Sequence, residues 1–135
     1  MRIRAGRVLT RLAALAGAIA LAATVGAAPA NASADGFAYT EFYGKFDSYA
    51  GTAYFQAYGD KFILEDRYAD GAGVFLWYLV AGSTAHTLYW GGGAGTSHTF
   101  NLEFAENKQV QFYVCLQDDG VIQTHTCSAV EYAVS

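Results

Sequence analysis

The feature that most constrains this chain is a series of short segments in which apolar and polar residues alternate and between which glycine recurs. Residues 52–58 are the clearest example. Every second side chain there would share one face of a strand, namely Ala53, Phe55 and Ala57. A Gly-Asp pair at 59–60 leads into a second alternating segment at 61–67. Two such runs joined by a short glycine turn predict a β-hairpin with one buried face.

Further segments of this kind predict an all-β protein. Residues 74–80 are apolar on both sides, which is typical of a central strand covered on both faces. The other expected strands are 37–43, 87–90, 97–104, 110–117 and 121–128. The chain has 21 aromatic residues and turn signals roughly every 8 to 12 residues, and it shows no helical stripe. We predict a small antiparallel β-sandwich, immunoglobulin-like or jelly-roll-like, formed by one domain at 35–135.

The N-terminus carries the pattern of a secretory signal peptide. Four arginines precede an apolar run at 12–25, and small residues follow, ending in an Ala-Ser-Ala triplet. The run is shorter than the roughly 20 residues that a membrane-spanning helix needs. We therefore expect a signal-peptide helix within 1–34 and a secreted, extracellular domain. Cleavage before Asp35 is favoured, with Asn31 and Ser33 as alternative first residues.

The charge of the mature domain argues against two classes of partner. Without residues 1–34, four basic residues remain against all 12 acidic ones, a formal charge of −8. Such a surface lacks the positive patch that nucleic acid requires, and anionic lipid would repel it. We therefore expect no nucleic-acid partner, no membrane association after cleavage, and a monomer.

Two cysteines, Cys115 and Cys127, predict one covalent crosslink, because an exported protein keeps such a pair oxidised. They would face each other across a final hairpin, which places Gln117 opposite His125 and residues 120–122 at the tip. Cys115 alternates with the apolar residues of its segment, so the disulfide should lie on the outer face or rim. Closing so short a loop contributes about 2–3 kcal/mol.

Catalytic and metal-binding motifs are weak in this sequence. The acidic segment 65–71 matches an EF-hand loop at three positions only, which favours a solvated turn and leaves calcium binding open. The histidines lack the spacing of a zinc site: His86, His98 and His125. Ser97 and His98 would point to opposite faces of a strand, which disfavours a serine hydrolase. We expect no catalytic residue, no metal, no cofactor and no enzymatic activity.

One surface is a candidate for binding. Tyr54, Gln56 and Tyr58 would lie on the outward side of segment 52–58, and tyrosines with amides suit a sugar or a protein. Alternatively, a second sheet or the N-terminal strand covers them. The expected function is a secreted, non-enzymatic binding or interaction module for carbohydrate, the cell wall or a protein. The alternatives are a hydrolase inhibitor that acts through the crosslinked tip at 116–126 and, less favoured, a small hydrolase.

Two stretches of the domain carry a recognisable pattern. Residues 53–62 contain a Tyr-Gly-Asp turn, and residues 66–74 follow the pattern D-x-x-A-D-G-x-x-V. With the late hairpin from Cys115 to Cys127, they resemble a family of small secreted proteins of Streptomyces and related actinobacteria, over roughly residues 50–130. The resemblance implies an exported β-sandwich. It transfers no function, because that family has no assigned catalytic residues.

Overall fold

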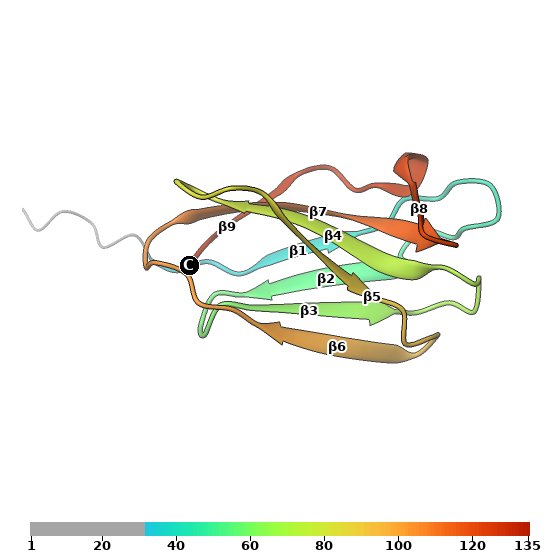
Figure 1. The fold of residues 1–135 in the computed structure, drawn as a ribbon, viewed down its shortest axis with the longest axis horizontal. Coiled ribbons are helices and arrows are strands. Elements are labelled where there is room, and N and C mark those ends of the chain that lie inside the picture. The colour runs from blue at the N-terminus through green and yellow to red at the C-terminus, as the bar shows by residue number, and fades with distance from the viewer. Residues whose placement is uncertain (1–31) are drawn as a thin grey trace, which may run out of the picture.

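Two antiparallel β-sheets pack face to face in the computed structural model, which describes residues 32–135 (Figure 1). The predicted signal peptide at 1–34 lies almost entirely outside the described residues. The first sheet has the strand order β1-β2-β3-β6: β1 (Gly36–Tyr39), β2 (Gly51–Gln56), β3 (Lys61–Asp66) and β6 (Thr96–Asn101). The second has the order β5-β4-β7, and β8 and β9 both pair with the free side of β7: β4 (Gly73–Val80), β5 (His86–Trp90), β7 (Gln109–Asp118), β8 (Val121–Gln123) and β9 (Glu131–Val134).

The backbone of residues 32–135 contains no α-helix. In that range the one helical element is a single 3-10 turn, η1 (Thr124–Thr126), and no helix is long and apolar enough to cross a membrane. The predicted all-β sandwich with one disulfide, between Cys115 and Cys127, is confirmed. Its β2 and β3 are neighbours in one sheet, whereas a constant-type immunoglobulin sandwich divides its second and third strands between its sheets.

The predicted first hairpin is present as β2 and β3, with Gln56 opposite Lys61 next to the turn. In that turn Gly59 and Asp60 have φ angles of 85° and 50°. This left-handed region is free of strain for glycine and costs aspartate less than most residues. The residues predicted to face inward are all buried: Ala53, Phe55 and Ala57.

Aromatic rings from both sheets fill the middle of the core. The ring centroid of Phe62 on β3 lies 4.9 Å from that of Phe55 on β2 and 5.2 Å from that of Phe112 on β7. All three side chains are fully buried. Burying a phenylalanine stabilises a fold by about 1.5–3 kcal/mol, so this trio is a main contribution to holding the sheets together.

Strand β4 is central in its sheet, because β5 pairs with one side of it and β7 with the other. Its inward residues, such as Val74 and Leu76, are fully buried. The alternating residues Phe75, Trp77 and Leu79 point to the outer face and are only half-buried. The prediction that this strand is covered on both faces is therefore wrong. An apolar pattern on both sides shows which side chains are apolar, but it does not show whether another layer of the protein packs on them.

Along one edge, which we call the closed edge, the two sheets are joined by backbone hydrogen bonds. β1 forms this edge in the first sheet, and β8, η1 and β9 form it in the second. Ala34 and Val134 exchange bonds of 2.9 and 3.0 Å, and the Glu41 N–H donates to the Thr126 carbonyl at 2.8 Å. Gly36 permits this approach, because a Cβ there would lie 2.8 Å from a core aromatic ring.

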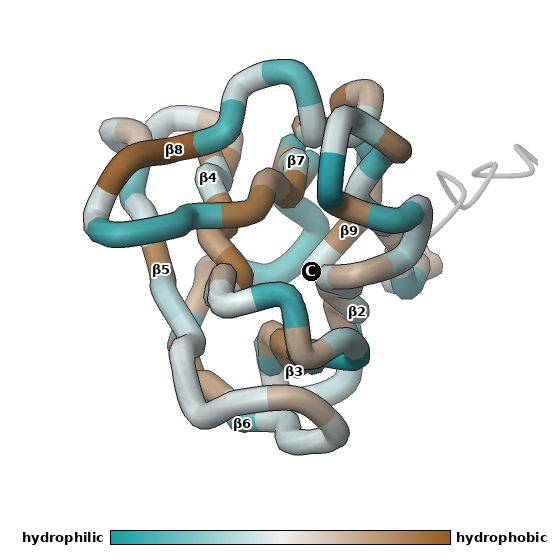
Figure 2. Tube along the Cα trace, turned by 90° about the vertical axis from the view of Figure 1, so that its right-hand side faces the viewer, coloured by the Kyte–Doolittle hydropathy of each residue, from teal (hydrophilic) through white to brown (hydrophobic). Residues whose placement is uncertain are grey.

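The opposite edge, between β5 and β6, is held by side chains, and we call it the open edge. Figure 2 shows β5 and β6 together at one side of the sandwich and β9 at the other. The Trp90 ring stacks on His98 with centroids 4.9 Å apart, and Trp90 Nε1 donates to Thr96 Oγ1 at 3.0 Å. No backbone hydrogen bond joins β5 to β6 in the described chain. Inward-facing side chains here keep contact with solvent: His86, Leu88, Trp90, His98 and Phe100.

Candidate binding surfaces

The predicted surface of Tyr54, Gln56 and Tyr58 is only partly assembled. Tyr54 and Gln56 lie half-buried on the outer face of β2, whereas Tyr58 lies in the turn and is 86% exposed. The Tyr54 hydroxyl donates to the Asp35 carboxylate, which also accepts the Ala57 N–H at 2.8 Å. These two bonds lower the pKa of Asp35, and the bond to Asp35 raises the pKa of Tyr54. β1 lies beside β2 rather than over it, so the tyrosines stay uncovered, but one already has a polar partner.

A larger apolar surface lies on the outer side of the other sheet. Five residues of β4, β5 and β7 form it, and we call them the aromatic face: Phe75, Trp77, Leu79, Tyr89 and Tyr113. The strand register places them together, because Trp77 lies opposite Tyr113 and Phe75 lies opposite Tyr89. The Trp77 and Tyr113 rings stack at a centroid distance of 5.2 Å and an angle of 16°. Tyr89 is 47% exposed and the other four are half-buried, so the face is open to a partner.

Strand β9 adds a further exposed aromatic residue beside the aromatic face. Gln111 on β7 lies opposite both Leu79 on β4 and Tyr132 on β9, and Tyr132 is 59% exposed. Sequence reasoning missed this surface, because it did not predict β9 and placed β4 in the middle of the core. A signal was available, since Gln111 and Gln117 alternate with apolar residues on the neighbouring strand. Polar residues there indicate that this side of the sheet faces solvent.

The crosslinked hairpin has a different register from the predicted one. Gln117 lies opposite Ile122, so the prediction that places it opposite His125 is wrong. η1 interrupts the second strand, and the chain then returns to β7 so that Cys127 bonds Cys115. The expected location on the outer face is correct, because Cys115 lies in register with residues of that face.

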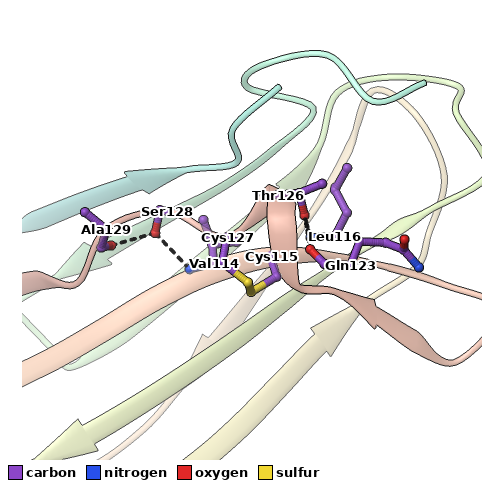
Figure 3. The surroundings of a disulfide bond; sticks show 8 residues. All are labelled: Val114, Cys115, Leu116, Gln123, Thr126, Cys127, Ser128 and Ala129. Carbon is purple, nitrogen blue, oxygen red and sulfur yellow. Dashed lines mark hydrogen bonds between the residues drawn. A yellow bond between two sulfur atoms is a disulfide. The ribbon is translucent and has the colours of Figure 1, made fainter. Parts of the chain in front are cut away.

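Side-chain hydrogen bonds explain why η1 interrupts the strand (Figure 3). Thr126 is fully buried: its Oγ1 accepts the Leu116 N–H at 2.9 Å, and its hydroxyl donates to the Gln123 carbonyl at 2.7 Å. The Val114 N–H donates to Ser128 Oγ at 3.2 Å. Two hydroxyl oxygens thus satisfy β7 donors that a continuous partner strand would otherwise bind.

The tip of this hairpin is apolar and exposed. Val121 and Ile122 are 62% and 37% exposed, and Figure 2 shows β8 as a hydrophobic segment between hydrophilic turns. Lys45 binds Asp118 at the base of the tip, with 2.8 Å between Nζ and Oδ2, and this is the one ion pair within residues 32–135. The predicted tip at 116–126 therefore presents two aliphatic side chains on a crosslinked support.

Two hollows open near opposite ends of the open edge. The larger, of about 500 Å³, lies between the end of β4, the loop at 81–85 and the loop at 102–108. The smaller, of about 370 Å³, lies beneath the glycine loop at 91–95, with Asp66 and Tyr89 among its lining residues.

The acidic turn at 65–71 is less solvated than predicted. Asp66 is only 3% exposed, and burial and then the nearby Asp70 charge raise its pKa, against a bond from the Tyr68 N–H that lowers it. Asp70 Oδ1 accepts the Ala72 N–H at 2.9 Å, but its buried Oδ2 has no partner among the described residues. The prediction of a solvated turn is therefore wrong for Asp66, because the register of β3 turns this side chain inward.

The three histidines lie apart, and each stacks on an aromatic ring. The partners are Tyr78 for His86, Trp90 for His98 and Tyr43 for His125, with centroid distances of 5.4, 4.9 and 4.5 Å. In the described part of the chain, no group of three or more His, Cys, Asp or Glu side chains is arranged to hold a metal ion.

Comparisons of this chain with protein-family models, with curated proteins and with solved structures return no match. Geometry and surface chemistry therefore carry the functional inference.

Proposed function

We propose that this protein is an exported, non-enzymatic binding module that holds a neutral polysaccharide, such as a cell-wall polymer, against its aromatic face. The main observation that supports this proposal is the stacked pair of Trp77 and Tyr113, flanked by Phe75 and Tyr89, on the solvent side of a regular sheet. Contiguous exposed apolar patches on small soluble domains are commonly interaction sites. The family resemblance and the secretory pattern of residues 1–34 support the part of the proposal that concerns export.

The chemistry of the face fits a sugar polymer. Aromatic side chains are rigid, apolar on their faces and, in tyrosine and tryptophan, polar at one end, so they contact both the C–H and the hydroxyl groups of a sugar. Side chains two residues apart on β4 are about 7 Å apart, which spreads the rings into a platform rather than a pocket. The acidic charge of the domain favours neutral over anionic polymers.

A retention assay with the mature secreted protein tests this proposal. The solid phases are chitin, cellulose and peptidoglycan. We expect retention on chitin or cellulose, which are neutral, rather than on peptidoglycan, which carries carboxylates, and Trp77→Ala and Tyr113→Ala should each reduce it about tenfold or more. Tyr58→Ala is the control, because it removes a more exposed ring from the β2–β3 turn, away from the aromatic face. Circular dichroism of each variant confirms folding. Equal losses in Trp77→Ala and Tyr58→Ala, or retention on none of the polymers, would contradict the proposal.

The hairpin tip supports a second candidate, a protein inhibitor of a secreted hydrolase. Its supporting observation is the exposure of Val121 and Ile122 on a crosslinked, pre-ordered loop, since pre-organisation reduces the entropy lost on binding. A panel of secreted hydrolases tests it. Inhibition of one hydrolase that Val121→Asp abolishes and Tyr113→Ala leaves intact would assign the function to the tip. No inhibition across the panel would remove this candidate.

A further inference from the structure

The larger hollow at the open edge has the size and lining of a small-molecule site. Its volume of about 500 Å³ is within the range of about 300–1,000 Å³ that is usual for ligand pockets. Tyr78 and Val80 from the end of β4 line one part of it, and Leu102 and Phe104 line another. These side chains are buried or half-buried members of the core or packed against it, so the wall is mainly apolar and preformed.

One buried residue in this wall has a polar group without a partner. Tyr78 is 6% exposed, and no hydrogen bond to its hydroxyl forms within residues 32–135. Burial raises the pKa of Tyr78 above its ordinary value near 10, so the hydroxyl carries its proton at neutral pH. The hydroxyl is not among the fully enclosed unpartnered side-chain atoms of the described residues, and Tyr78 belongs to the lining of the hollow. A donor with little access to water beside an apolar wall is available to an acceptor on a ligand.

The neighbouring rings hold Tyr78 in place. Its ring centroid lies 5.2 Å from that of Phe62, 5.8 Å from that of Phe104 and 5.4 Å from that of His86. Contacts on several sides prevent the ring from turning out to solvent, so the direction of the hydroxyl is set before any ligand arrives. The other side-chain hydroxyl of the lining, that of Ser83, already donates to the Val80 carbonyl at 2.8 Å.

The charges of the lining do not favour an ionised ligand. Glu103 and Lys108 supply one charge of each sign, and both side chains belong to exposed residues. A neutral ligand therefore does not require either of these two side-chain charges to be buried without a partner. The acceptor that matches Tyr78 is then a carbonyl-type oxygen rather than a carboxylate.

We propose that this hollow is a binding site for a small, neutral, mainly apolar molecule that carries a carbonyl-type acceptor, and that the Tyr78 hydroxyl donates to this acceptor. The hollow is separate from the aromatic face, which lies on the outer side of the same sheet. The proposal for the hollow therefore does not depend on the proposed function. It makes the open edge a specific pocket rather than an incomplete part of the core.

The experiment is an NMR titration of the folded mature protein with three probes of similar shape: acetophenone, benzoate and α-methylstyrene. We expect saturable shifts of amides around the hollow, such as Ser83 and Ala105. Acetophenone should bind about three- to tenfold more tightly than α-methylstyrene, the amount that one net hydrogen bond contributes. Benzoate should bind no more tightly than acetophenone.

Two variants make the test specific. Tyr78→Phe removes only the hydroxyl and should bring the affinity of acetophenone down to that of α-methylstyrene. Ala105→Trp, at an exposed position of the lining, should fill the hollow and abolish binding of every probe. Tyr113→Phe is the matched control on the outer face and should change no affinity. The proposal is overturned by non-saturable shifts with all probes, by tighter binding of benzoate, or by an acetophenone preference that survives in Tyr78→Phe.

Discussion

The closed edge and the open edge of this sandwich bury polar groups in opposite ways. At the closed edge, buried Thr40 and Thr126 have hydrogen-bond partners for their hydroxyls, and Ser135 does as well. At the open edge, the Tyr78 hydroxyl has no partner in the described chain, and the buried Asp66 carboxylate, which lines the smaller hollow, accepts one bond, from the Tyr68 N–H.

This difference assigns different roles to the two edges. A buried polar group with its full set of partners adds stability and fixes a unique arrangement, whereas one without partners costs stability until a ligand arrives. The closed edge is therefore where changes should affect folding, and the open edge is where they should affect binding.

The largest expected effect comes from the disulfide at the closed edge. Cys115→Ala combined with Cys127→Ala should lower the free energy of unfolding by about 2–3 kcal/mol, because the crosslink restricts the unfolded chain. Urea denaturation with circular dichroism measures it. Reduction of the wild-type protein serves as the control and should give a similar loss. A loss below about 0.5 kcal/mol would show that the edge is held by its hydrogen bonds alone.

Thr126→Val should have the next largest effect. The substitution keeps the shape of the side chain but leaves the buried Leu116 N–H without an acceptor, at a cost of about 1–3 kcal/mol. Thr124→Val is the matched control at an exposed position of the same turn, and it should change the stability by less than about 0.5 kcal/mol. Equal effects of both variants in urea denaturation would be inconsistent with a specific role for Thr126.

At the open edge, Asp66→Asn should raise the free energy of unfolding near neutral pH, whereas the two preceding changes lower it. Burial raises the pKa of Asp66, so the folded protein binds its proton more tightly than the unfolded chain does. The free energy of unfolding therefore falls as the pH rises from about 4 through the raised pKa. Asp66→Asn should remove this decline and be more favourable relative to wild type at pH 7 than at pH 4. Thermal melts across this range measure it, with Asp47→Asn, which alters an exposed carboxylate, as the control.

The smallest effect concerns the N-terminus of the closed edge. Ala34 exchanges two backbone hydrogen bonds with Val134, so a chain that begins at Asp35 should be about 1 kcal/mol less stable than one that begins at Ser33. The favoured cleavage before Asp35 removes this bridge, whereas cleavage before Ser33 or Asn31 keeps it. Intact mass spectrometry of the secreted protein identifies the first residue. A mature chain that starts at Asp35 and is equally stable would show that this bridge contributes nothing to the closed edge.

The sequence pattern was sufficient where the alternation within one strand determines which side chains are buried. The alternation at 52–58 predicted the β2–β3 hairpin and its buried residues, since the period of two places side chains on a face without reference to other strands. The pairing of Cys115 with Cys127 followed from their being the only cysteines. Of the candidate site residues, Tyr58 is exposed and Tyr54 already has a partner in Asp35, an outcome that the alternation left open.

The remaining features depend on partners distant in the sequence. Phe75 and Trp77 carry the same apolar pattern whether a second layer covers them or solvent does. The break at η1 results from Thr126 binding the backbone of β7, a contact that spacing does not reveal.

The sequence by itself determined the class of the fold, the first hairpin and the crosslink, because alternation and a single cysteine pair are local properties of the chain. Only the tertiary structure decided which edge is closed, that the outer side of β4 is an aromatic face, and that Tyr78 lines a hollow without a hydrogen-bond partner. These features depend on which surfaces the two sheets bury when they pack, and the shapes of both sheets together determine those surfaces.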